Sequence, residues 1–416
     1  MHIIIFSPLL TPRIKYIFNF IFKDILRAEV EFTGNSEFFI QSEHAKISYA
    51  DRPLGDELFF KNTALLLSNK VEEPKLKTIS FGDYIVPFPV EESALPFDVF
   101  AASFFIISRY EEYLHKEKPG DNFEAKNSFQ YKWKILKRPI IDEWALILKN
   151  MIKKKNPSFK FFEKKFVNQP TINLTLRPDV PAGFLPKTKF IFSSVFNKKQ
   201  KYLSTLFDDF TGLGTDNKKV ITSLDILKIQ PIYFINFIED DKNRLAYEKS
   251  KLLLRGKQIG LLKPCSDKET STFLKKDLIK LGKLQNSPVN LISQQLEALK
   301  LPACYLNLVS TGITSDYSMG YANQVGFRAG TCTPFSWYDL ELEKVTPLNV
   351  KSYSISDTAI HYLNITDATQ TISNFIDAVK LVDGHFYTCW HLKNLSENVK
   401  FKKWKAIFNE MLKSAG

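Results

Sequence analysis

Cysteine and histidine are scarce in this sequence, and that scarcity limits the metal and nucleophilic sites it can hold. The 416 residues include 4 Cys, at positions 265, 304, 332 and 389, and 6 His. The cysteines lack the CxxC spacing of structural zinc sites, and the histidines form neither HxxxH nor HExxH. We expect four reduced, mostly buried thiols, which are typical of a reducing compartment.

A membrane-spanning run is also missing. No stretch reaches the roughly 18 uncharged apolar residues that a span requires. The N-terminus has neither the basic region nor the small-residue cleavage site of a secretory signal peptide. We therefore expect a cytoplasmic protein without a membrane span.

Nucleotide-binding and nucleic-acid-binding patterns are absent as well. Residues 212–214 (Gly-Leu-Gly) lack the third glycine of a dinucleotide fingerprint, and the sequence has no P-loop and no GxSxG elbow. The formal net charge is +12, but the lysines are spread along the chain without a basic block that contains aromatics. We interpret this charge as a solvated surface and expect no nucleic-acid partner.

Apolar and aromatic residues, by contrast, are abundant. Hydrophobic residues make up 44% of the chain, and 36 residues are Phe, which is enough for a large core and is not typical of disorder. The length fits two domains. We predict a smaller N-terminal α/β domain over residues 1–155 and a second domain over residues 165–416.

The first domain is predicted from its periodicity and cap residues. Thr11 and Pro12 fit an N-cap and a first helical position, and Asp142 is a plausible cap of a later helix. We expect strands over 3–6, 29–33 and 84–89, and helices over 12–26, 97–114 and 142–154.

The second domain alternates predicted strands and helices, which favours a parallel sheet or barrel. Its first strand places Asn173 and Thr175 on one face. We expect strands over 171–176, 232–238, 258–262, 289–292, 314–317, 326–329 and 385–391. We expect helices over 244–256, 270–285, 303–311 and 367–382. Barrels of this kind place their chemistry at the C-terminal ends of the strands.

Three stretches carry a resemblance to a known family. They are AASFFIISRYEEYL at 101–114, DYSMGYANQVGFRAGTCTPF at 316–335 and TCWH at 388–391. Together they resemble the polysaccharide deacetylases (NodB homology) of Bacteroidetes-type bacteria, which carry an N-terminal domain of unknown function. The resemblance implies a deformed (β/α) barrel of the NodB type that removes acetyl groups from N-acetylated sugars.

The resemblance also implies a set of catalytic groups, and this sequence departs from that set. The family needs an aspartate as general base, an aspartate and histidines that hold a divalent metal, an arginine that orients the base, and a late histidine. Base and metal ligands are replaced here, because amide, hydroxyl and leucine side chains stand in their places. The replaced positions are Asn173, Thr175, Leu262, Ser266 and Gln295.

Two family positions are retained, namely Arg328 and His391. They are the candidate catalytic or site residues. The candidate binding residues are Asp316, Tyr317, Trp337 and Trp390, and Tyr338 is a further possible stacking surface for a sugar. A structural role for the 316–335 stretch, as a loop folded over the barrel mouth, is the alternative.

Three functions follow from this pattern. The first is a non-catalytic carbohydrate-binding relative of the deacetylases, with no cofactor. The second is an active hydrolase with a rearranged site of Asp179, Asp316, Arg328 and His391, and only this one would need a metal such as zinc. The third is a scaffold for a protein partner, recognised by residues 1–150.

Overall fold

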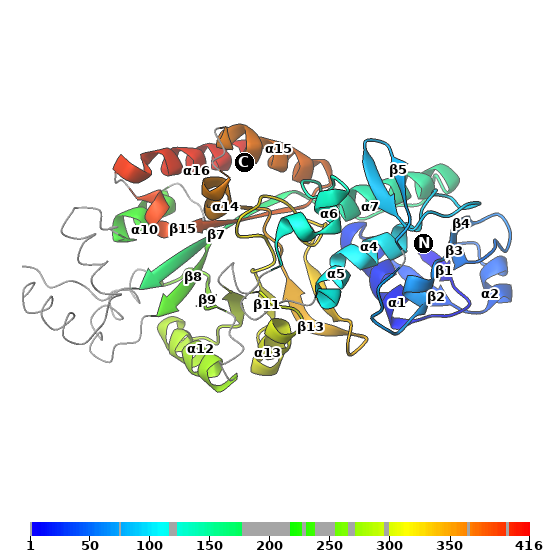
Figure 1. Ribbon diagram of the computed structural model, residues 1–416, viewed down its shortest axis with the longest axis horizontal. Coiled ribbons are helices and arrows are strands. Elements are labelled where there is room, and N and C mark those ends of the chain that lie inside the picture. Colours follow the sequence, from blue (N-terminus) through cyan, green and yellow to red (C-terminus); the bar gives the residue numbers. More distant parts are fainter. Residues whose placement is uncertain are drawn as a thin grey trace, which may run out of the picture.

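The computed structural model describes residues 2–74, 76–115, 123–176, 217–226, 230–237, 254–264, 271–294, 299–363, 367–396 and 399–416. Its N-terminal part lies beside a long sheet that carries helices on two sides (Figure 1). The largest cluster of buried hydrophobic residues contains side chains of both parts, from Ile3 to Ala415.

The N-terminal part is built on a four-stranded parallel sheet with the strand order β2-β1-β3-β4, and a two-stranded antiparallel pair, β5-β6, accompanies it. The strands are β1 (Ile3–Phe6), β2 (Val30–Thr33), β3 (Ala45–Ala50), β4 (Leu58–Lys61), β5 (Thr78–Phe81) and β6 (Tyr84–Pro87). The helices are α1 (Pro12–Asn19), a π-helical turn η1 (Phe20–Ile25), α2 (Ser36–Gln41), α3 (Ala64–Leu67), α4 (Val99–Ile107), α5 (Tyr110–Leu114), η2 (Ala125–Asn127), α6 (Phe129–Lys132) and α7 (Ile140–Lys155).

The predicted start of the first helix is confirmed. Thr11 is the N-cap of α1, and its hydroxyl accepts a hydrogen bond from the backbone N–H of Ile14 at 3.1 Å. Pro12 is the first helical residue. The predicted Asp142 cap is wrong: α7 begins at Ile140, and the Asp142 carboxylate accepts hydrogen bonds from the distant loop 331–333 instead.

The second part is built on a nine-stranded mixed sheet, mostly parallel, with the order β12-β13-β11-β10-β9-β8-β7-β15-β14. The strands are β7 (Val167–Leu176), β8 (Ile232–Phe237), β9 (Ile259–Leu262), β10 (Leu291–Ser293), β11 (Ser315–Asp316), β12 (Phe335–Asp339), β13 (Lys344–Val350), β14 (Ile355–Ser356) and β15 (His385–His391). The helices are α10 (Asn217–Ile226), α12 (Ser271–Gln285), α13 (Ala303–Thr311), α14 (Asp357–Tyr362), α15 (Ala368–Leu381), η3 (Leu392–Leu395), η4 (Val399–Phe401) and α16 (Lys402–Ala415).

The predicted α/β class is confirmed, whereas the predicted barrel is not. Within the described ranges, no hydrogen-bonded pairing joins the edge strands β12 and β14, so the sheet stays open. A short distance across the sheet shows that it is nevertheless strongly curved. The ring of Tyr317, next to β11, lies 5.8 Å from the ring of Tyr387 on β15, although these strands are not neighbours in the sheet. Helices α12 and α13 cover one side, and α15 and α16 the other (Figure 1).

Other sequence predictions fail at identifiable places. The expected strand 326–329 is a loop in which Gly326 and Phe327 donate backbone hydrogen bonds to Ser354 and Leu136. The hairpin β12–β13 was not expected. Most of the expected helix 244–256 lies outside the described residues.

The cysteines differ from the expectation at one position. Cys332 and Cys389 are free and buried, but Cys304 is disulfide-bonded. The expectation of four reduced thiols is therefore wrong, and thiol chemistry no longer supports a reducing compartment. The described helices include none that is long and apolar enough to cross a membrane.

Candidate functional site

The inner face of the curved sheet carries some of the positions that the resemblance singled out, among them Leu262 and Tyr317. Side chains point to this face at every second residue of a strand. The face carries one cluster of buried residues, namely Ile232, Phe234, Leu262, Tyr317, Tyr353, Tyr387 and Cys389. Leu262, one of the replaced family positions, therefore belongs to this buried cluster.

Asn173 on β7 lies at the edge of this cluster. Its amide Nδ2 is 3.4 Å from Cys389 Sγ, and its Oδ1 is buried without a hydrogen-bond partner in the part of the chain that the structure describes. Burial raises the pKa of the Cys389 thiol to about 12, so the thiol stays neutral at physiological pH. Asn173 and Cys389 are therefore both uncharged here. The Thr175 side chain, Ser266, Gln295 and Asp179 lie outside the described residues.

His391 ends β15 directly beside Asn173 in the strand register. Its Nδ1 lies 2.8 Å from Asp357 Oδ1, and its backbone N–H donates to Asp357 Oδ2 at 2.7 Å. The Asn394 amide also donates to Asp357 Oδ2 at 2.7 Å. Asp357 is fully buried, whereas the His391 side chain is 33% exposed. This geometry fixes the imidazole and leaves Nε2 as the nitrogen without a partner among the residues that the structure describes.

The two partners shift each other's pKa in opposite directions. Burial alone would lower the pKa of His391, but the Asp357 charge and hydrogen bond raise it above 6.5. Burial alone would raise the pKa of Asp357, but His391 and the hydrogen bonds hold it below 3.8. The pair therefore stabilises the fold most at pH values between the folded pKa of Asp357 and the folded pKa of His391. Its contribution is lost as pH rises through the folded pKa of His391, or falls through that of Asp357.

A histidine titration tests this pair. We expect His391 in the native protein to titrate above 6.5, and Asp357→Asn to lower its pKa because the neighbouring anion is gone. NMR of the imidazole resonances measures both values. His385 is the internal control, because burial and the nearby Lys164 charge lower its pKa to about 4. An unchanged His391 pKa in the variant contradicts the assignment.

Arg328 lies in a buried ion-pair cluster between the two parts of the chain. Its Nε donates to Glu112 Oε1 at 3.0 Å and its Nη2 to Glu112 Oε2 at 2.6 Å, while Nη1 donates to the Gly320 carbonyl at 3.0 Å. Glu112 belongs to α5 of the N-terminal part and also accepts from Arg109 Nε at 2.8 Å. Every nitrogen of the Arg328 fork thus has a partner within this cluster.

Asp316 lies on the opposite sheet face from its neighbour Tyr317. Its carboxylate accepts hydrogen bonds from the Tyr305 hydroxyl at 2.6 Å and from the Ser318 backbone at 3.0 Å, and from the Ser318 hydroxyl. Burial raises the pKa of Asp316 to about 6, although these hydrogen bonds oppose the shift. Tyr317 faces the inner cluster. The structure therefore does not bring Asp316 to His391.

The candidate stacking residues are enclosed by protein. Trp337, Trp390 and Tyr338 are each at most 1% exposed. Trp337 packs against Tyr305 with ring centroids 5.2 Å apart, and Trp390 against Phe408 at 5.0 Å. Their rings fill the core and present no open face to a sugar.

The 316–335 stretch packs closely against other segments, and two glycines permit this. A Cβ on Gly320 would lie 2.1 Å from the Tyr353 ring. Gly330 has φ +68°, in the left-handed region, and a Cβ there would lie 2.4 Å from Ile106 of α4. The loop therefore has a definite structural role between the two parts.

Two site partners were not foreseen from the sequence. Glu112 is 216 residues before Arg328, and Asp357 follows the two-residue strand β14. Only the acidic pair in the stretch SRYEEY signalled Glu112, and nothing local signalled Asp357.

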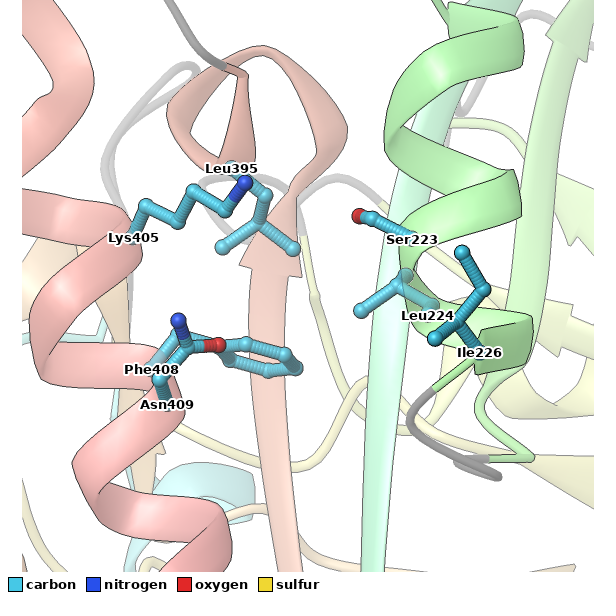
Figure 2. Close-up of a pocket in the computed structure, with 7 residues that line it drawn as sticks. All are labelled: Ser223, Leu224, Ile226, Leu395, Lys405, Phe408 and Asn409. Carbon is cyan, nitrogen blue, oxygen red and sulfur yellow. The ribbon is translucent and has the colours of Figure 1, made fainter.

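A separate pocket of about 250 Å³ lies between α10, η3 and α16. Its walls include Leu224, Ile226, Leu395 and Phe408, and Figure 2 shows Leu224 and Phe408 directed into the gap between the two helices. The pocket contains none of the predicted site residues.

A metal ion of the zinc class does not fit the groups that surround Asn173. The neighbouring thiol stays protonated, the amide is neutral, and the Asp357 carboxylate is already bonded to His391 and Asn394. In the ranges that the structure describes, no three His, Cys, Asp or Glu side chains form a group that could hold a metal. The expectation of a chain without cofactor stays a prediction.

Comparison with known proteins gives two similarities. Residues 3–157 match a family of unknown function, DUF7033. The structure is similar to that of a candidate polysaccharide deacetylase from Mycobacterium smegmatis, with a TM-score of 0.39 and 9% identity, over 61% of this chain and 85% of that chain. No curated protein matches the sequence.

Proposed function

We propose that this protein is a non-catalytic carbohydrate-binding relative of the polysaccharide deacetylases. The observation that carries the proposal is the pairing of Arg328 with Glu112. In the family that the sequence resembles, the corresponding arginine orients the catalytic base. Here Nε and Nη2 of Arg328 donate to the Glu112 carboxylate of the N-terminal part, and Nη1 donates to the Gly320 carbonyl. Three of its five N–H donors are used in this way, and the Glu112 carboxylate neutralises the charge that would orient a base.

Several polar groups on strands of the large sheet or in the inner cluster suit a neutral, hydroxyl-rich ligand. Asn173 Oδ1, Ser293 Oγ and the Tyr353 hydroxyl are buried and have no hydrogen-bond partner among the described residues. Buried polar groups of this kind cost free energy until a partner binds them. Sugar hydroxyls both donate and accept hydrogen bonds, so they match amide and hydroxyl groups better than an ion would.

The test combines turnover with binding. We expect no acetate release from N-acetylated oligosaccharides, with or without added zinc. We expect the same oligosaccharides to shift NMR resonances at the inner face and to bind more weakly to Asn173→Ala. Asn374→Ala, on the exposed side of α15, is the matched control and should bind as the native protein does. Acetate release that a chelator abolishes contradicts the proposal.

A hydrolase is the second candidate, and the Asp357–His391 pair is the observation that favours it. A histidine held by a buried carboxylate, with Nε2 free, is suited to proton transfer. This candidate predicts acetate release that is lost in His391→Gln. Release without zinc that survives a chelator but not His391→Gln would favour it over the binding function.

A further inference from the structure

Lys351 is a half-buried cation for which the described residues provide no anionic partner. It follows β13, and its backbone N–H donates to the Asp316 carbonyl at 2.9 Å. Its Nζ donates to the Tyr317 hydroxyl at 2.9 Å and lies 3.3 Å from Ser315 Oγ. Among the residues that the structure describes, no carboxylate pairs with it. Burial lowers the pKa of this amine, because a desolvated ammonium without a counter-ion is costly.

His385 borders the same pair of aromatic rings. Its ring stacks on Tyr387 at 5.9 Å and 5°, and Tyr387 contacts Tyr317 edge-on at 5.8 Å. His385 Nδ1 is buried and has no hydrogen-bond partner within the described ranges. These side chains bring together the Lys351 amine, the hydroxyls of Ser315 and Tyr317, and His385 Nδ1. The hydrogen-bonding capacity of these groups is not fully used.

The charges around His385 are mostly positive. Besides burial, the charges of Lys164, Arg27 and Lys351 lower its pKa, and the charge of Asp142 opposes them. Asp142 is already the acceptor of hydrogen bonds from Thr331, Thr333 and the Cys332 backbone. A positive field with free donors attracts an anion.

We propose that the inner face of the sheet binds a small oxyanion, a phosphate, sulfate or sulfate-like group, at Lys351, Ser315, Tyr317 and His385. Lys351 supplies the charge, and the hydroxyls and the imidazole N–H supply directed donors. The group belongs either to a free inorganic ion or to a substituted sugar. The site goes beyond the proposed carbohydrate function and does not depend on it, because an inorganic ion alone is sufficient to occupy it.

The first test uses the native chain and needs no variant. Sodium sulfate, compared with sodium chloride at equal ionic strength, is expected to raise the pKa of His385 from its low value in a saturable way, because an adjacent anion favours the imidazolium. NMR of the imidazole measures the shift. His391, which already faces Asp357, is the internal control. An unshifted His385 at saturating sulfate overturns the proposal.

Variants then locate the site. Lys351→Gln is expected to weaken sulfate binding at least about tenfold, since a charge-assisted hydrogen bond in a buried site is lost. Lys344 lies at the exposed start of β13, the strand that Lys351 follows. Lys344→Gln should therefore bind sulfate as the native chain does. If Lys351→Gln does not fold, Tyr317→Phe removes one donor and is expected to weaken binding several-fold. Unchanged affinity in either variant overturns the proposal.

Separate arms distinguish the two sources of the oxyanion. Glucose 6-phosphate that binds more tightly than inorganic phosphate indicates a sugar substituent, whereas equal affinity indicates a free ion. Glucose alone serves as the neutral control. A site that binds glucose as tightly as glucose 6-phosphate is not an oxyanion site, although the carbohydrate-binding proposal would survive that result.

Discussion

Replacing Glu112 with alanine is expected to destabilise the protein by about 3–5 kcal/mol, the range typical of a broken buried ion pair. The Glu112 carboxylate is enclosed and bonded to both Arg328 and Arg109. Removing it leaves two buried guanidinium groups, whose other described partners are Glu111 and neutral acceptors. Urea denaturation, followed by tryptophan fluorescence, measures the free energy of unfolding.

The charge on Glu112 also predicts a dependence on pH. Burial would raise its pKa, but the Arg328 and Arg109 charges hold it below the usual value of 4.5. The stability that this carboxylate contributes is therefore present above its unfolded pKa and lost as pH falls through the folded one. The alanine variant should lose stability less steeply in acid than the native chain.

Two controls separate lost charge from lost packing. Glu124→Ala removes an exposed partner of Lys126, and we expect little change, because surface ion pairs contribute little. The double variant Glu112→Leu with Arg328→Leu removes both charges, so it should be more stable than Glu112→Ala alone. A single variant as stable as the native chain would show that this ion pair does not link the two parts.

Replacing Asp142 with alanine is expected to destabilise the protein by about 2–4 kcal/mol, because it leaves several buried donors without an acceptor. The carboxylate accepts from the hydroxyls of Thr331 and Thr333, both at 2.6 Å, and from the Cys332 N–H at 3.1 Å. The Lys164 ammonium lies 3.9 Å away and would lose its nearest described anion.

The conservative variant gives the sharper comparison for this position. Asp142→Asn keeps one side-chain acceptor oxygen, so it should recover part of the stability that the alanine variant loses. Both free energies come from the same denaturation curves. If asparagine and alanine destabilise the protein equally, the charge next to Lys164 matters more than the hydrogen bonds to the loop.

Local elements could be predicted because their causes are local. Helix α1 starts at Thr11 and Pro12, where a side-chain acceptor and a fixed φ angle start a helix without help from distant residues. Strand β15 and helix α13 have the bounds that periodicity predicts, His385–His391 and Ala303–Thr311. In each case the signal lies within a few residues.

The break in the predicted helix 97–114 has a distant cause. Arg109 has φ 55° and separates α4 from α5. Its guanidinium donates to the Arg328 carbonyl, 219 residues along the chain, and to Gln130. A left-handed arginine costs free energy locally, and these long-range partners, together with Glu111 and Glu112, compensate for it. Propensity alone predicts the continuous helix.

The candidate site shows the same division. From the sequence alone it could be concluded that Asn173 and Leu262 are uncharged and that Arg328 and His391 are present, because residue identity decides which groups can ionise. Only the tertiary structure decided that Arg328 pairs with Glu112 and His391 with Asp357, and that the sheet stays open. Those outcomes depend on which distant side chains share a desolvated volume, and no local pattern records that.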